Sequence, residues 1–486
     1  RYLSLGADFM HERSLYLSIL VKIVPRFYDI VIVKTTVLSS APIIKVADPN
    51  YTFMIGRWRQ ANYDILGLLP VCAQGARLVI LDRRGRIMTD IKTTSARTLR
   101  GQVAVVGVGE TEYYKRGEAP DPEFKLALEA IVTACENAGI SPTEIDGFTS
   151  YSNDRSDASR LAAALGIDDL RLANMQWGGG GGGGSAAIAN ASAAIATGGA
   201  ECVVVFRALA QGQFGRFGQG PQRNTISGEN AHTIPYGLMT PAQMFAMKVQ
   251  RFMHDHGVEQ AALRAISMAS YHHAQHNPRA VMYGRPLTEE IYDESRWIVE
   301  PFHLYDCCQE NDGAAAMILV SAERAKDFPH PPCYLLSAVS GSHHRAGAPV
   351  HNAPDYATST FKTVAPRLYR MGGVEASDVD VLQSYENFTG GVMMSIVEHG
   401  FCHPDEVNEF FVNDRFLSPS GDLPLNTSGG NLAECYMHGL GLNIEAVRQI
   451  WGESTSQVND AEVSMVISGP MVTPVSACIF GAESTI

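Results

Sequence analysis

The same order of elements occurs twice along the chain, and this duplication constrains the fold more than any other feature of the sequence. Residues 371–400 repeat the pattern of residues 138–166: a helix end, a short acidic turn, an apolar strand ending in Ser-Tyr, and another helix. A glycine-rich turn, a helix and a further apolar strand then follow in each copy, over residues 181–206 and 428–468. Two copies of one strand-and-helix unit predict a layered, pseudo-symmetric α/β protein.

Local signals place the first elements of this unit after residue 100. The apolar run at 101–109, GQVAVVGVG, is bounded by glycines and is typical of a buried strand. The helical segment that follows has Asp121 as its expected N-cap and Gly139 at its end. Ser141 and Glu144 have capping-box spacing. Because strands alternate with helices, we expect a mainly parallel sheet.

The first hundred residues differ in composition from the remainder. Residues 1–100 hold 5 of the 45 glycines and carry 15 Lys and Arg against 7 Asp and Glu, whereas the remainder carries 23 basic and 44 acidic residues. We therefore predict an atypical N-terminal extension over residues 1–100. Met88 opens an ordinary polar tail before the first strand, so the expectation is that translation starts there and that residues 1–87 are non-native upstream sequence. A small extra domain is the alternative.

The rest of the chain divides into two predicted halves, residues 101–330 and 331–486. The first half contains an insertion, about residues 207–306, with helical stretches such as the one that Thr240 caps. Insertions of this kind usually cover a site. We interpret this one as a helical loop domain.

Composition excludes several classes of protein. A formal net charge of −13 argues against nucleic acid as the main partner. No apolar run is long enough to span a bilayer. The nine cysteines show neither CxxC nor Cys/His spacing, which indicates reduced thiols in a cytoplasmic protein and no metal site.

Three segments resemble the thiolase superfamily, in order and in spacing. They are ENDGAAAMILVSAERA at 310–325, QSYENFTGGVMMSIVEHGFC at 383–402 and PLNTSGGNLAECYMHG at 424–439. The resemblance extends over about residues 101–486 and is nearest the sterol-carrier-type thiolases, often called lipid-transfer proteins. It implies the duplicated thiolase fold, a five-layer αβαβα arrangement, with a helical loop domain in the N-terminal half.

The chain departs from the superfamily at the residues that carry thiolase chemistry. The nucleophilic cysteine of a thiolase stands at the start of a helix, where the helix N-terminus stabilises the thiolate; that position is Gly181 here, inside the run Gly178–Gly184. The position of the motif asparagine is Tyr385. The histidine position is Tyr436, and His438 lies two residues later. Acyl transfer through a covalent intermediate needs a nucleophile, and no residue takes that role here.

The altered residues resemble those of the steroid side-chain-cleaving aldolases in the lipid-transfer branch. The resemblance implies retro-aldol cleavage of a β-hydroxyacyl-CoA, which needs a base, donors for the enolate oxygen and an acid, but no nucleophile. We assign this acid-base work to Tyr385 and Tyr436, supported by His438 or Asn387. Glycine brings backbone N–H groups close to a ligand and leaves room for a bulky ring. Substrate binding is therefore assigned to three glycines: Gly181, Gly182 and Gly430.

The same resemblance implies products, partners and an assembly. The products would be a ketone, such as a 17-keto steroid, and a short acyl-CoA such as propionyl-CoA. CoA would enter only as part of the substrate, with no other cofactor. A separate OB-fold, zinc-ribbon protein is the implied partner. A homodimer is expected to form through the strand ECVVVF at 201–206, and residues 213–220, QFGRFGQG, also resemble this branch.

Two other functions remain open from the sequence. One is an acyltransferase that uses a different cysteine, with Cys435 and Cys478 as candidates. The other is a noncatalytic lipid or acyl-CoA-binding subunit that supports a partner enzyme. For the glycine run itself, a flexible linker is the alternative reading.

Overall fold

The chain forms two compact units, Arg1–Arg97 and Thr98–Ile486. The computed structural model describes residues 98–486 except Asn153, Gly179, 215–224, Arg345 and 347–354; before residue 98 it describes only the strands. Most of the stretch QFGRFGQG therefore lies outside the described residues.

The described residues of the first unit form antiparallel strands. Three of them form a sheet in the order β1-β2-β3, another three form β4-β5-β6, and the last two pair as β7-β8. Their bounds are β1 Tyr2–Leu3, β2 Ile19–Val24, β3 Phe27–Ile32, β4 Lys45–Asp48, β5 Tyr51–Gln60, β6 Tyr63–Val71, β7 Arg77–Leu81 and β8 Ile87–Lys92.

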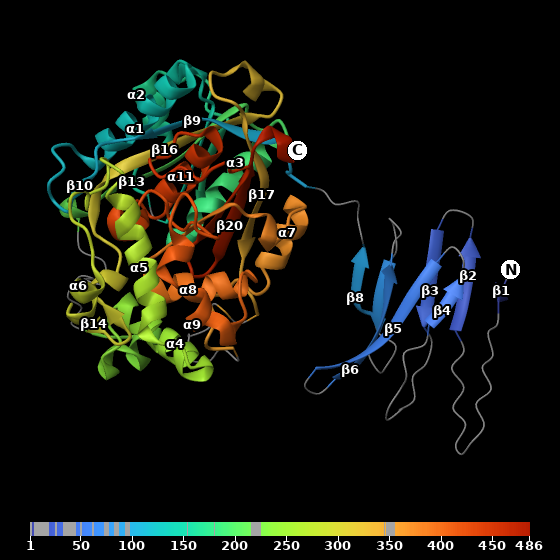
Figure 1. Cartoon of the computed structure of the whole chain (residues 1–486). Helices are drawn as coiled ribbons and strands as arrows, with labels where there is room; N and C mark the ends of the chain where they lie inside the picture. Colours follow the sequence, from blue (N-terminus) through green and yellow to red (C-terminus); the bar gives the residue numbers. More distant parts are fainter. Residues whose placement is uncertain are drawn as a thin grey trace. The chain divides into compact units, whose positions relative to one another are not determined.

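The second unit is built on a ten-stranded mixed sheet in the order β12-β11-β13-β16-β9-β17-β20-β19-β18, with β10 paired to β16 (Figure 1). The strands are β9 Val103–Glu110, β10 Tyr114–Lys115, β11 Gly147–Tyr151, β12 Leu172–Gln176, β13 Cys202–Ala210, β14 Trp297–Val299, β15 Phe302–His303, β16 Asn311–Ser321, β17 Cys333–Gly341, β18 Val381–Ser384, β19 Val463–Ser468 and β20 Val475–Gly481. The helices are α1 Glu123–Ala138, α2 Ala158–Leu165, α3 Gly184–Ala196, α4 Pro241–His256, α5 Gln260–Ala274, α6 Glu289–Asp293, α7 Ala365–Gly372, α8 Thr389–Glu398, α9 Val407–Phe410, α10 Gly430–Ala433 and α11 Leu440–Trp451.

Strand direction corrects one expectation from the sequence. Parallel pairing joins β11 to β12 and β13, and β18 to β19. The other ladders of the sheet are antiparallel, among them β13-β16, β16-β9, β17-β20 and β19-β20. The prediction of a mainly parallel sheet was therefore wrong. The prediction extended the alternation of strands and helices to the last strand of each half, which are β16 and β20. The chain instead enters β16 from a long connection and β20 from a hairpin, and both strands run antiparallel to their neighbours.

Topology confirms the duplication. In the first half the order β11-β13-β16-β9 has one parallel ladder followed by two antiparallel ones. In the second half β18-β19-β20-β17 has the same sequence of ladders. The two sheets join where β9 pairs with β17.

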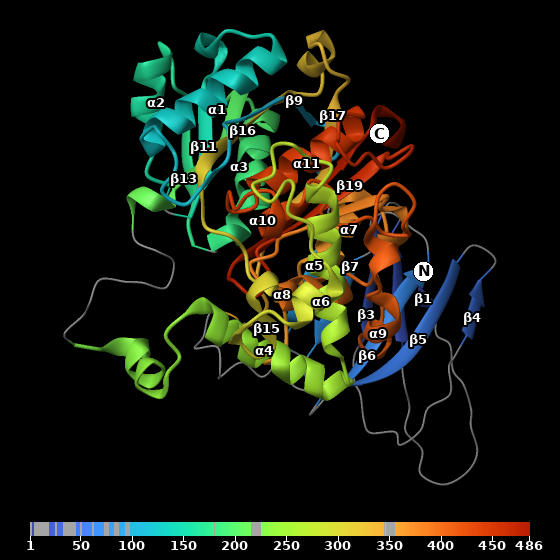
Figure 2. The ribbon, with the colours of Figure 1, turned by 60° about the vertical axis from the view of Figure 1, so that its left-hand side comes forward.

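Three hydrophobic cores separate the layers of the second unit. Alternate residues of β9 face opposite cores, with Ala104 and Val106 beneath α1 and α2 and Val103 and Val105 against α3 and α11. The third core lies between the second-half strands and α4, α5, α7 and α8. Figures 1 and 2 show α1 and α2 toward the top of the second unit and α7 and α8 below them. Helices and sheets thus alternate in the αβαβα order that the sequence predicts.

Helix ends follow the sequence signals with one exception. Thr240 caps α4 and Ser141 forms its capping box with Glu144, as predicted. Gly139 ends α1 in the left-handed region. Asp121, however, is not the N-cap of α1, because Pro122 takes that position and Asp121 instead pairs with Lys125 at 2.8 Å.

Two expectations about β13 need correction. The loop domain was expected to begin at residue 207, but β13 continues to Ala210, so Arg207 belongs to the sheet. The segment ECVVVF was expected to form a dimer interface, yet β13 lies between β11 and β16 and both of its edges are already paired. The edge strand on this side of the sheet is β12.

Candidate active site

The glycine run forms the entry to α3. Gly180–Gly183 make a short 3-10 turn and α3 follows from Gly184. Gly181–Gly184 are buried, so this part of the run is not a linker. A Cβ atom built on Gly181 would lie 2.1 Å from Cζ of Tyr385 and 2.2 Å from its hydroxyl oxygen. The volume that a side chain at Gly181 would need is therefore filled by the Tyr385 ring.

Tyr385 and Tyr436 meet at the centre of the second unit. Tyr385 directly follows β18, and its N–H donates to the carbonyl of Ile467 in β19 at 2.9 Å. Tyr436 lies between α10 and α11, where its N–H donates to Asn311 Oδ1 at 2.9 Å. Their hydroxyl oxygens are 2.7 Å apart. Elements from both halves of the chain thus bring the two phenols into one hydrogen bond.

The two phenols are neutral at rest. They are 2% and 5% exposed, and this burial raises the pKa of both hydroxyls well above the usual value of 10. For Tyr436, the hydrogen bond with Tyr385 and the positive charge of Arg207 act in the opposite direction and lower the pKa. Tyr436 is therefore better placed than Tyr385 to carry a negative charge transiently.

His438 lies beside this pair. Its ring centroid is 5.2 Å from that of Tyr436, with the two rings nearly perpendicular. The residue is 5% exposed and has a backbone φ of 49°, which is uncommon for a residue other than glycine. Burial, followed by the charge of Arg207, lowers the pKa of the imidazole well below 6.5, so the ring is neutral.

Asn387 has a local partner. Its Oδ1 accepts the backbone N–H of Phe388 at 2.9 Å, at the start of α8, and its own carbonyl accepts the N–H of Cys308 at 3.1 Å. These bonds fix the turn that follows Tyr385. A direct role for Asn387 toward the tyrosines stays a prediction.

The other two predicted glycines are also closely packed. A Cβ on Gly182 would lie 2.6 Å from the carbonyl oxygen of Pro474, and one on Gly430 would lie 1.9 Å from Glu386 Oε1. Gly430 also has a φ of 57°. Their assignment as substrate-binding residues stays a prediction.

Glu386 was missed in the sequence, although it stands between two predicted site residues. It is fully buried, and its Oε2 accepts the N–H of Asn431 at 3.0 Å and Nδ2 of the same residue at 2.9 Å. Burial is the largest influence on this carboxyl and raises its pKa from 4.5 to about 7. The acidic residue between Tyr385 and Asn387 in the segment YENF was the signal that could have found it.

We expect Glu386→Gln to change how stability depends on pH. A buried acid with a raised pKa keeps its proton in the folded state after the unfolded chain has lost it. Its contribution to the free energy of unfolding therefore falls as pH rises from about 4.5 to about 7. The neutral glutamine should flatten this decline, measured by urea unfolding at about pH 5 and about pH 8. Glu136→Gln, on the exposed side of α1, is the control; equal slopes in both variants would contradict the assignment.

The cysteines offered as alternative nucleophiles are buried and protonated. Burial raises the pKa of Cys435 well above 9 and that of Cys478 to about 12. The Cys478 thiol donates to Asn443 Oδ1 at 3.2 Å. Neither thiol has the lowered pKa that an attacking cysteine needs.

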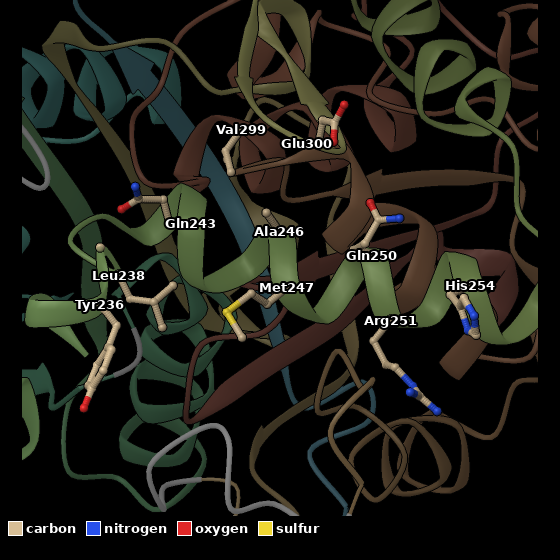
Figure 3. Close-up of a pocket in the computed structure, with 11 residues that line it drawn as sticks. Tyr236, Leu238, Gln243, Ala246, Met247, Gln250, Arg251, His254, Val299 and Glu300 are labelled. Carbon is tan, nitrogen blue, oxygen red and sulfur yellow. The ribbon is translucent and has the colours of Figure 1, made fainter. Parts of the chain in front are cut away.

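A surface pocket of 610 Å³ lies along α4, away from the predicted site residues (Figure 3). Its lining combines apolar and polar side chains, among them Tyr236, Met247, Gln250, Arg251 and Glu300. None of the predicted catalytic residues lines it. Among the residues that the structure describes, no helix has both the length and the apolar character to cross a membrane, and no three His, Cys, Asp or Glu side chains gather as a metal site requires.

The fold and the site together define a thiolase-like protein with a buried pair of tyrosines packed against Gly181. Residues 341–482 match the family model described as thiolase C-terminal domain-like. The chain is 37% identical to a steroid side-chain-cleaving aldolase of Thermomonospora curvata over 79% of this chain and 99% of the relative. It is also 37% identical to the 17-hydroxy-3-oxo-4-pregnene-20-carboxyl-CoA lyase of Mycobacterium tuberculosis, over 79% of this chain and 100% of the relative.

Structural comparison agrees. The chain superimposes on the Ltp2-ChsH2(DUF35) aldolase with a TM-score of 0.74 and 36% identity, covering 79% of this chain and 99% of that one. A more distant relative is an acetyl-CoA acetyltransferase of Methanothermobacter thermautotrophicus, 26% identical over 75% of this chain. The chain belongs to the thiolase superfamily, in the branch that contains the steroid side-chain-cleaving aldolases.

Proposed function

We propose that the chain is a carbon-carbon lyase that performs retro-aldol cleavage of a β-hydroxyacyl-CoA, with a steroid as the part that carries the hydroxyl. The observation that supports this most directly is the buried hydrogen bond of 2.7 Å between the Tyr385 and Tyr436 hydroxyls. Those hydroxyls stand at the superfamily's asparagine and histidine positions, while its cysteine position is Gly181. Relatives that share more than a third of their residues with this chain carry lyase and aldolase names.

The reaction balances with these groups alone. One tyrosine takes the proton of the substrate hydroxyl, and the carbon-oxygen bond becomes a ketone as the bond between the α- and β-carbons breaks. The electron pair of that bond forms the enolate of the thioester. A proton returned to the α-carbon completes a short acyl-CoA, such as propionyl-CoA. No free CoA, oxidant or metal ion takes part in this sequence of steps.

Tyr436 is the proposed base and Tyr385 the proposed donor. A phenol ordinarily has a pKa near 10, so a tyrosine base needs a donor or a cation nearby. Tyr436 has both influences, from the Tyr385 hydroxyl and from the charge of Arg207. The N-terminus of α3 adds a partial positive charge close to the Tyr385 hydroxyl. Proton transfer between the two tyrosine hydroxyls then links removal of the proton from the substrate hydroxyl to delivery of a proton to the α-carbon.

His438 and the backbone of the glycine run are the proposed donors to the thioester oxygen. A neutral imidazole with one N–H stabilises an enolate oxygen by hydrogen bonding. At the start of α3 the N–H groups of Ser185 and Ala186 donate to the hydroxyls of Ser468 and Ser476. The proposed backbone donors are therefore those of the preceding turn, Gly180–Gly183. CoA enters as part of the substrate, and no further cofactor is proposed.

A partner protein and a homodimer complete the proposal. The structural neighbour is described as an aldolase of Ltp2 with ChsH2(DUF35), which supports a second protein for this chain as well. We propose an OB-fold, zinc-ribbon protein in that role. For the homodimer, the edge strand β12 pairs with β11 on one side only within the described residues, which makes it available to a second copy. A cytoplasmic location is proposed from the thiol pattern.

Product analysis tests the proposed reaction. The full chain, co-expressed with the OB-fold partner, is incubated with a steroid β-hydroxyacyl-CoA in deuterated water without free CoA. We expect the ketone and the acyl-CoA to form in equal amounts, with one deuterium at the α-carbon of the acyl-CoA. Mass spectrometry measures both products and the intact protein.

The two alternative functions give different results in the same experiment. An acyltransferase would require free CoA and leave the protein heavier by one acyl group. A noncatalytic subunit would bind the acyl-CoA but release no ketone, even with the partner present. Either result would contradict the lyase proposal.

A further inference from the structure

Arg207 is a charged residue in a strand that is buried along its whole length. All nine residues of β13 are buried, and the side chain of Arg207 is 2% exposed. Its neighbours on the strand are Phe206 and Ala208, and Ala315 lies opposite in β16. A guanidinium taken out of water is costly unless its charge and its N–H groups are paired. The contacts of this side chain therefore indicate what it is for.

Asp154 neutralises the charge. Nη1 of Arg207 donates to Asp154 Oδ2 at 2.8 Å, and Nη2 donates to the carbonyl of Ser152 at 3.1 Å. The carboxylate is held in turn by the N–H groups of Ala208 at 3.1 Å and Ser156 at 2.8 Å. The ion pair is thus fixed to the backbone at both ends, so the guanidinium has a defined orientation.

Two further donors of the guanidinium point to His438. Nε lies 3.3 Å and Nη2 lies 3.2 Å from Nδ1 of the imidazole. A guanidinium has no acceptor, so Nδ1 must be the acceptor and carries no proton. In a neutral imidazole the single proton is then on Nε2. The arrangement also disfavours imidazolium, because a second proton on Nδ1 would face two N–H donors and a positive charge.

The backbone of His438 is fixed from the other side. The Tyr151 hydroxyl donates to the carbonyl oxygen of His438 at 2.9 Å. Gly183 makes room for this tyrosine, since a Cβ there would lie 2.5 Å from Tyr151 Cβ. The groups that face the imidazole include the Arg207 guanidinium from β13 and the phenols of Tyr151 and Tyr436.

We propose that Arg207, held by Asp154, is a positioning residue that keeps His438 as a neutral imidazole with its proton on Nε2, so that His438 donates a hydrogen bond and does not act as a base. The donation to a thioester oxygen rests on the proposed function. The tautomer does not, because it follows from the contacts of Arg207 in the protein without substrate.

Nitrogen NMR tests the tautomer in the wild-type protein. The imidazoles are labelled with ¹⁵N, and the signal of His438 is identified by its loss in His438→Gln. We expect an unprotonated Nδ1 and a protonated Nε2 from about pH 5 to about pH 8, the range in which an ordinary histidine changes charge. A proton on Nδ1, or a titration near pH 6.5, would overturn the proposal whether or not the chain cleaves any acyl-CoA.

Kinetics test the role in turnover. Arg207→Lys keeps the charge without the fork of donors, and the double variant Arg207→Met with Asp154→Asn removes both charges so that neither is left unpaired. We expect kcat to fall about 10- to 100-fold with little change in KM. In the double variant a new acidic limb should appear at a pH that is still below 6.5, because the charge of Arg207 is gone while the burial that lowers the pKa of His438 remains.

Arg155→Gln is the matched control. Arg155 is 41% exposed and lies 3.4 Å from Glu123, so its loss removes a neighbouring ion pair without touching His438. It should leave kcat and the pH profile unchanged. A purely structural role for Arg207 would lower the melting temperature but create no acidic limb, and that result would overturn the proposal. If the double variant does not fold, the kinetics of Arg207→Lys and the NMR measurement on the wild-type protein still test the positioning role of Arg207.

Discussion

Tyr385→Phe and Tyr436→Phe are each expected to lower kcat for β-hydroxyacyl-CoA cleavage by roughly 100- to 10,000-fold, the usual range for loss of a general acid or base. Phenylalanine keeps the ring and its packing, so the change removes only a hydroxyl from the pair that is 2.7 Å apart. KM should change little, because the ring surfaces remain. Steady-state kinetics with release of the ketone measure both constants.

The double variant, with both Tyr385→Phe and Tyr436→Phe, tests whether the two hydroxyls act together. Two groups that share one hydrogen bond and one proton act as a unit, so removing the second hydroxyl should add little to the loss caused by the first. Tyr369→Phe is the matched control, since that phenol is partly buried and donates to the His399 carbonyl at 2.9 Å outside the site. Each variant loses roughly 1 kcal/mol from one hydrogen bond, so melting temperatures should be similar. A double variant that cleaves substrate at the wild-type rate would rule out both assignments.

The fold was predictable from the sequence because the duplication is visible in the order of local elements. Helix signals such as the Thr240 cap and the Ser141 capping box depend on a few neighbouring residues, and the structure contains both. Strand direction depends on connections between distant segments. For this reason the antiparallel entry of β16 and β20 and the central position of β13 were not predicted.

The site was predictable as a set of positions and not as a set of contacts. Motif alignment identified Tyr385 and Tyr436, which the structure brings into contact. It could not show that the Tyr385 ring fills the space beside Gly181, since the two residues are remote in sequence. Arg207 was assigned to the loop domain, although it belongs to β13 and the burial of its charge there is what indicates its role.

Gly181→Ala is expected to abolish most of the activity and to lower the free energy of unfolding by about 1–3 kcal/mol, the usual cost of overpacking a core. The new Cβ would lie 2.1–2.3 Å from two ring carbons and the hydroxyl oxygen of Tyr385, closer than any real contact, so the ring must move. A displaced ring loses its hydrogen bond to Tyr436. Gly184→Ala is the matched control, because its Cβ would meet nothing closer than 3.4 Å. Urea unfolding and kcat measure the two effects.

A cysteine at the same position should not restore thiolase chemistry. Gly181→Cys places a thiol at the helix N-terminus, but its side chain meets the same ring, and the asparagine and histidine positions of a thiolase are occupied by Tyr385 and Tyr436. No acyl-enzyme should therefore appear by intact mass spectrometry after incubation with an acyl-CoA. An acylated Gly181→Cys protein would show that the two tyrosines do not exclude the covalent acyl-cysteine chemistry of a thiolase.

The steric link between Gly181 and Tyr385 can be measured directly. Leucine lacks the ring atoms that the new Cβ would meet, so Gly181→Ala should be much less destabilising when Tyr385 is also changed to Leu. A double-mutant cycle on unfolding free energies isolates this coupling, which we expect to exceed about 1 kcal/mol. A coupling near zero would mean that the glycine is needed for some other reason. With the expected coupling, loss of a side chain at position 181 and gain of the phenol are one structural change, because the Tyr385 ring fits only when residue 181 has no side chain.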